Sequence, residues 1–110
     1  MGLSDWFKKV LPSKTTTPME HYKSGIDRAK KKDNEGAINA YSQAIDHPTT
    51  DESLKSMALY NRALVFHVED KNDEAAADLE KVIKMHGAHA KVKTAARSKL
   101  NRINKRTGQK

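Results

Sequence analysis

The 110-residue sequence predicts an all-α fold, in which two antiparallel helix pairs stack as a solenoid and one further helix caps the stack. The prediction depends on an internal repeat, on small residues at fixed points of the helices, and on helix-capping residues between them. A single helix pair cannot bury its apolar face alone, so repetition indicates stacking. Seven pairs of residues match in kind at a spacing of 38: Met19 and Met57, Tyr22 and Tyr60, Gly25 and Ala63, Ile26 and Leu64, Ala37 and Ala75, Tyr41 and Leu79, Ile45 and Ile83.

Small residues mark the predicted contact between the two helices of each pair. Gly25 and Ala37 hold these places in the first copy, and Ala63 and Ala75 hold them in the second. A small side chain at a fixed point on each antiparallel helix lets the two backbones approach closely. We therefore expect all four residues to be buried between helices.

Capping residues set the boundaries of the first repeat, expected at about 18–47. The sequence Thr17-Pro18-Met19-Glu20 combines a capping box with proline at the first helical position, so a helix is expected from about Pro18 to Lys31. Asp33 and Asn34 open the second helix. A proline and further capping residues at 46–51 separate the two copies, where an insertion costs little.

The second repeat, at about 51–86, is bounded in the same way. Thr50 or Asp51 caps a helix that runs to about Glu69 and is apolar nearly all round, so it is expected to be buried at the centre. Asn72 is expected to cap a helix to about Met85, which Gly87 ends. A capping helix over 89–105 follows, with one narrow apolar stripe and a polar outer face.

The repeat resembles the tetratricopeptide family over about residues 19–85. The family's first-helix pattern is found at 25–29 and 63–66, and its second-helix pattern at 36–45 and 74–83. Tyr60-Asn61-Arg62-Ala63 is a sequence motif typical of that family. The period exceeds the family's of about 34 by four residues, and Arg28 stands where a large apolar residue is usual. The resemblance implies a helical-hairpin scaffold for protein binding.

Tetratricopeptide-like stacking would place one stripe of each first helix along a concave groove. The groove residues are then Met19, Tyr22, Ile26, Met57, Tyr60, Asn61 and Leu64. Apolar stripes at helical spacing are usually core, so the stripe is either packing or a binding groove for an amphipathic helix. The carboxylate clamp of family co-chaperones is mostly missing, since only Asn61 and, depending on register, Lys91 match it.

A short amphipathic helix is predicted at 1–12, joined to the repeats by a linker at 13–17. Its apolar residues follow the i, i+3, i+4, i+7, i+8 rule and are Leu3, Trp6, Phe7, Val10 and Leu11. Three docking sites compete for it: its own groove, within one chain or swapped between two; a partner protein; and a membrane surface.

Positive charge is concentrated at the C-terminal end. Residues 81–110 hold 10 basic and no acidic residues, whereas residues 1–80 hold 11 basic and 14 acidic, for a net charge of +7. This basic face continues into a tail at 106–110 and is either a solvated surface or a site for an acidic protein, anionic lipid or nucleic-acid phosphate. Nothing favours nucleic acid, because stacking aromatics and known motifs are absent there. Its main residues are Lys91, Arg97, Arg102, Lys105 and Arg106.

Other chemistries find little support in the sequence. The absence of cysteine excludes a disulfide framework and thiolate catalysis, and fits a reducing, cytoplasmic environment. Only His86 and His89 are closely spaced histidines, and no phosphate loop or nucleophile elbow is present. We expect no cofactor, no metal and no catalysis, but an adaptor that binds a peptide or helix. The alternative is a peripheral membrane or polyanion-binding protein that uses the N-terminal helix and the basic face.

Overall fold

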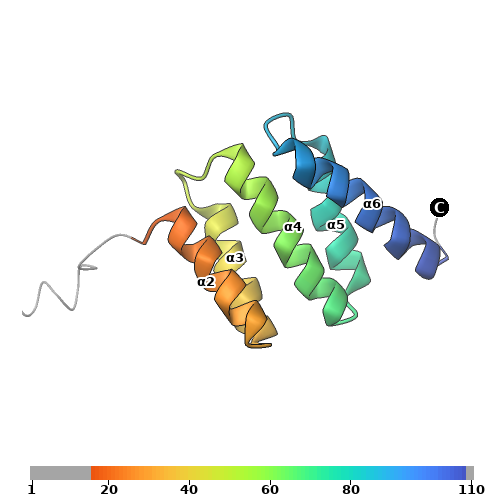
Figure 1. Cartoon of the computed structure of the whole chain (residues 1–110), viewed down its shortest axis with the longest axis horizontal. Helices are drawn as coiled ribbons and strands as arrows, with labels where there is room; N and C mark the ends of the chain where they lie inside the picture. The colour runs from red at the N-terminus through yellow and green to blue at the C-terminus, as the bar shows by residue number, and fades with distance from the viewer. Residues whose placement is uncertain (1–15, 109–110) are drawn as a thin grey trace, which may run out of the picture.

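The computed structural model describes residues 16–108, which form five α-helices (Figure 1). They are α2 (Pro18–Lys30), α3 (Asn34–Asp46), α4 (Glu52–Val68), α5 (Asn72–Lys84) and α6 (Ala90–Arg106). Strands are absent from this described part, so the predicted all-α class is confirmed. None of these helices combines the length and the apolar character that a membrane span requires.

The helices are arranged as hairpins in two layers. α2 packs against α3 and α4 against α5, while α3 also lies against α4, and α5 against α6. In Figure 1, α2, α4 and α6 form the layer nearer the viewer, and α3 and α5 lie behind them. We call the first set the front-layer helices. α4 contacts the other four described helices, which confirms its predicted central position.

Three of the helix starts are capped by the predicted side chains. Thr17 accepts a hydrogen bond from the backbone N–H of Glu20 at 3.1 Å, and the Glu20 carboxylate accepts one from the Thr17 N–H at 3.3 Å, which completes the capping box. Asp33 and Asp51 cap α3 and α4, each accepting the backbone N–H three residues ahead. These bonds satisfy N–H groups that have no partner inside the helix.

The start of α5 differs from the prediction. Lys71 holds the N-cap position without a side-chain bond, and Asn72 is the first residue of the helix, so the prediction that Asn72 is the cap was wrong. The Asn72 Oδ1 atom lies 2.9 Å from Nδ1 of His67 instead. Its side chain therefore joins the start of α5 to the end of α4.

The predicted stop at Gly87 was also wrong, because α5 already ends at Lys84. Gly87 lies in the following loop, where its N–H donates a hydrogen bond of 2.7 Å to the Glu52 carboxylate. A Cβ atom at this position would overlap that carboxylate. Glycine is needed here for the close approach of the loop to the start of α4. α6 begins and ends one residue later than expected.

The turns of the two hairpins repeat the spacing of the sequence. Lys32 and Asp70, 38 residues apart, have φ angles of 63° and 62°. Each is followed by a residue whose N–H donates to the carbonyl five residues earlier, Asp33 to Arg28 at 2.9 Å and Lys71 to Phe66 at 2.8 Å. The two copies therefore share turn geometry as well as residue pattern. Arg28 also forms an ion pair with Asp33 at 2.9 Å.

The core lies between the layers and contains the small residues that the repeat singled out. Gly25, Ala37, Ala63 and Ala75 are all buried, as predicted. α4 is less enclosed than expected, because Val68 is 72% exposed and Leu64 is only half-buried. The expectation that α4 is buried nearly all round was therefore wrong on the side that faces away from α3 and α5. The larger buried side chains include Tyr41, Leu59, Leu79 and Val82.

Candidate functional site

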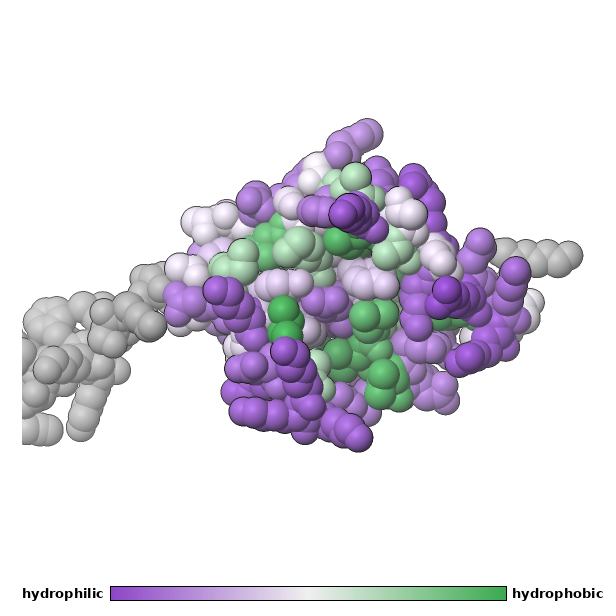
Figure 2. Space-filling model, in the orientation of Figure 1, coloured by the Kyte–Doolittle hydropathy of each residue, from purple (hydrophilic) through white to green (hydrophobic). Residues whose placement is uncertain are grey.

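An open groove with a volume of about 400 Å³ lies between α2 and α4, with α3 beneath it. Its walls are mostly apolar, and Figure 2 shows apolar side chains gathered over the middle of this face, bordered by hydrophilic ones. Apolar side chains that remain accessible in a hollow are typical of binding sites. The lining residues are Ile26, Ala29, Lys30, Tyr41, Asn61, Leu64 and Val65.

The floor of the groove depends on the contact between Gly25 and Tyr41. Gly25 is buried in α2, and a Cβ atom there would lie 2.5 Å from Cδ1 and Cε1 of the Tyr41 ring. That distance is far below van der Waals contact, so only glycine lets α2 rest on this ring. The Tyr41 side chain, which is 2% exposed, thereby fixes the depth of the groove at the α2–α3 contact.

A polar cluster closes one side of the groove. The Asn61 amide donates a hydrogen bond of 3.0 Å to the Tyr22 hydroxyl, and the Tyr22 and Tyr41 ring centroids lie 6.0 Å apart at an angle of 49°. Burial raises the pKa of Tyr41 to about 12; nearby Tyr22 adds to this rise, and a hydrogen bond with the Asn61 side chain opposes it. The Tyr41 phenol is therefore a hydrogen-bonding group rather than a base at neutral pH.

The structure brings together three of the seven predicted groove residues. Ile26, Asn61 and Leu64 line the groove, and Tyr22 is joined to it through Asn61. Met57 and Tyr60 are half-buried outside the lining, with Tyr60 packed against the core. Met19, at the start of α2, is 44% exposed and does not reach the groove.

The groove also contains residues that the sequence did not predict there. Tyr41, Lys30 and Val65 line it, although none of them was among the predicted groove residues. Pairing of Gly25 with a large residue on α3 was the signal for Tyr41, because a missing side chain on one helix leaves room for a ring on the next. No sequence signal placed the aliphatic stem of Lys30 beside apolar side chains.

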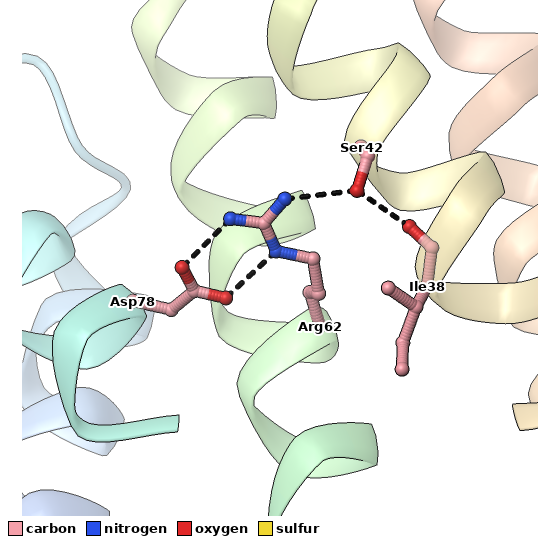
Figure 3. Close-up of polar contacts among 4 residues, drawn as sticks. All are labelled: Ile38, Ser42, Arg62 and Asp78. Carbon is pink, nitrogen blue, oxygen red and sulfur yellow. Dashed lines mark hydrogen bonds and ion pairs between the residues drawn. The ribbon is translucent and has the colours of Figure 1, made fainter. Parts of the chain in front are cut away.

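A polar network around Arg62, which was also missed, joins the two hairpins behind α4 (Figure 3). Arg62 donates from Nε and Nη2 to the two carboxylate oxygens of Asp78 on α5, both at 2.8 Å, and from Nη1 to Ser42 of α3 at 2.9 Å. The Ser42 hydroxyl in turn donates to the Ile38 carbonyl at 2.7 Å, and the Arg62 guanidinium carbon lies 5.6 Å from the centroid of the Phe66 ring. The network is fully paired inside the protein, so its role is structural.

No family model, curated protein or solved structure matches this chain. The function of the groove is therefore inferred from its geometry and from the charge around it.

The basic face lies along α6 and has no acidic partner within residues 16–108. All five of its main residues are exposed, and the two ion pairs found in the described part of the chain involve none of them. Lys93, another cation of α6, donates to the Met85 carbonyl at 3.0 Å. The five residues are Lys91, Arg97, Arg102, Lys105 and Arg106.

The remaining predicted sites are not brought into a cluster. His86 and His89 are exposed, and residues 16–108 contain no group of three or more His, Asp or Glu side chains that could hold a metal ion. The predicted N-terminal helix with Leu3, Trp6, Phe7, Val10 and Leu11 lies outside the described residues, so its docking site stays a prediction. The groove between α2 and α4 is the strongest candidate site.

Proposed function

We propose that this protein is a non-enzymatic adaptor of the tetratricopeptide type, which binds a peptide or helix of another protein in the groove between α2 and α4. One observation carries the proposal: the half-buried side chains of Ile26 and Leu64 line a hollow of about 400 Å³ that stays open to solvent. Covering apolar side chains in an open groove removes them from water and favours binding of a partner. The absence of cysteine supports a cytoplasmic site of action.

The shape of the groove supports a helical or extended partner. Its walls are two helices side by side, and a row of apolar residues on a partner helix fits such a hollow at i, i+3, i+4 and i+7 spacing. Val68, 72% exposed, lies one turn beyond Leu64 on α4 and extends the apolar surface past the end of the groove. Met19 adds a second exposed apolar side chain on α2.

The test measures binding of labelled amphipathic helical peptides to the full chain by fluorescence anisotropy. Leu64→Lys is expected to abolish binding, because it places a charge in the apolar hollow. Ala77→Lys is the matched control: Ala77 is exposed on α5 in the rear layer, so the same new charge there leaves binding unchanged. Equal affinities of the wild type and Leu64→Lys would show that the groove is not the binding site.

A further inference from the structure

The three front-layer helices share one register at the 38-residue spacing. Ala58 of α4 and Ala96 of α6 are both 0% exposed, and Val65 and Ile103 are 6% and 2% exposed. Residues 38 apart therefore take equivalent places on α4 and α6. Gly25 of α2 and its counterpart on α4 are likewise both buried, which extends the register to α2.

This register relates the row of α4 that contains Asn61 and Leu64 to a cationic row on α6. On α4 the row runs Met57, Asn61, Leu64, Val68, at the i, i+4, i+7, i+11 positions that share one helix face. The equivalent residues of α6 are Ala95, Lys99, Arg102 and Arg106, and those of α2 are Met19, Lys23, Ile26 and Lys30. One continuous face thus holds apolar side chains on α4, cations along α6, and two lysines among the apolar residues of α2.

The charges on this face have no ion-pair partner in the described part of the chain. Arg102, Arg106 and Lys30 are exposed, Lys99 is half-buried, and none of them belongs to an ion pair within residues 16–108. Lys30 also lines the groove itself. The hollow thus has one free cation on its α2 wall, and the cationic row of α6 lies beyond its α4 wall. This arrangement is complementary to an apolar stripe that is bordered by carboxylates.

We propose that the groove receives an amphipathic helix of another protein whose apolar stripe is bordered by acidic residues. The apolar stripe covers Ile26, Leu64 and Val68, and the carboxylates meet the α6 row formed by Lys99, Arg102 and Arg106. This inference rests on the proposed binding function of the groove and names the chemistry of the partner.

Charge argues against two other occupants. The N-terminal segment of this chain has a suitable apolar stripe, but it carries Lys8 and Lys9 against the single acid Asp5 within residues 1–12. A second copy of the chain that docked by the same face would bring one cationic α6 row against another. Both occupants place like charges together, which costs free energy at an interface.

Two synthetic helical peptides with the same leucine pattern test the proposal, one with glutamates beside the leucines and the other with lysines. Anisotropy with the full chain at low salt is expected to give about tenfold or greater preference for the glutamate peptide. The preference should shrink as salt is added, because screening acts over about 10 Å at 0.1 M ionic strength.

Two charge reversals on one helix localise the effect. Arg102→Glu is expected to weaken binding of the glutamate peptide about tenfold and to strengthen binding of the lysine peptide. Arg97→Glu is the control, since it makes the same charge change on α6 at about 140° around the helix axis from Arg102 and should change either affinity less than about twofold. Both residues are exposed, and circular dichroism checks that each variant remains folded.

The outcomes separate the acidic partner from the binding function itself. If both peptides bind equally and Leu64→Lys abolishes the binding of both, the proposal of an acidic partner is wrong and the adaptor function stands. If neither peptide binds, both proposals are overturned. Tighter binding of a peptide of residues 1–12 than of the glutamate peptide also overturns the inference. So does binding to phosphatidylserine vesicles that Arg102→Glu abolishes and Leu64→Lys does not, which would identify a membrane-binding surface.

Discussion

At the scale of single residues, the contact between Gly25 and Tyr41 determines how closely α2 approaches α3. Gly25→Ala is expected to lower the free energy of unfolding by about 1 to 2 kcal/mol, because overpacking against the ring exceeds the gain of about 1 kcal/mol in helix propensity. Urea unfolding measures the change. In the Tyr41→Leu background the same substitution should cost much less, since the ring is gone; equal costs in both backgrounds would contradict the contact.

The pair Arg62 and Asp78 allows a second test at this scale. Asp78→Ala is expected to lower the free energy of unfolding by about 3 kcal/mol, because it leaves the Arg62 guanidinium without its carboxylate. The side chains of Arg62 and Asp78 are only 17% and 4% exposed. The value lies at the low end for buried pairs, because Arg62 keeps its bond to Ser42. Replacing both by Met and Leu should cost far less than the sum of the single changes, and additive costs in a double-mutant cycle would contradict the coupling.

Tyr41 predicts a loss of stability at alkaline pH. Its pKa in the folded protein is about 12, against 10.0 for an ordinary tyrosine, so the folded state holds the proton more tightly than the unfolded state. The corresponding stabilisation is complete below pH 10 and is lost as the pH rises from about 10 to about 12. Urea unfolding across this range should show a smaller alkaline loss for Tyr41→Phe than for the wild type. An unchanged pH dependence would contradict the assignment to Tyr41.

At the scale of the elements, the left-handed residue of each hairpin turn is a source of strain. Lys32 has a φ of 63°, which costs a non-glycine residue about 1 to 2 kcal/mol, so Lys32→Gly is expected to stabilise the protein by about 0.5 to 1 kcal/mol after the entropy of glycine is subtracted. Lys31, with a φ of −84°, gains no such relief. Lys31→Gly is therefore the control and should be destabilising in the same thermal unfolding assay.

The helices and their order could be predicted because local chemistry determines them. Capping side chains such as Thr17 and Asp51 act within three residues, and the spacing of Gly25 and Ala63 requires only one helix face. The errors at Asn72 and Gly87 have a different origin. Each residue bonds to a side chain of α4: Asn72 to His67, five residues earlier, and Gly87 to Glu52, 35 residues earlier. Helix-capping patterns do not contain such contacts.

The candidate site was less predictable than the fold for the same reason. Ile26 and Leu64 could be placed in a groove because they repeat at one register of the first helices. Tyr41 comes from α3, the other helix of the hairpin, and Lys30 has a long flexible side chain. The positions of both side chains therefore depend on packing between helices. Arg62 and Asp78 lie 16 residues apart, and their pairing follows only from how α4 and α5 are placed side by side.

At the scale of the whole molecule, charge is distributed unevenly. α6 has no acidic residue in its 17 positions, and its cations repel one another at i, i+3 and i, i+4 spacing. Added salt is therefore expected to raise the melting temperature of the free protein, because it screens this repulsion. Thermal unfolding at low and high salt measures the effect. A melting temperature that falls with salt would show that attractive charge pairs dominate instead.

The central position of α4 determines how the molecule unfolds. In a linear array of helix pairs, each unit touches only its neighbours and the ends can open independently. Here α4 contacts α2, α3, α5 and α6, and Arg62 on it bonds to a helix of each hairpin. Neither hairpin can therefore leave without exposing the apolar surface of the other. Residues 16–108 should behave as one cooperative unit, with slow amide exchange concentrated in α4 and its nearest turns of α3 and α5.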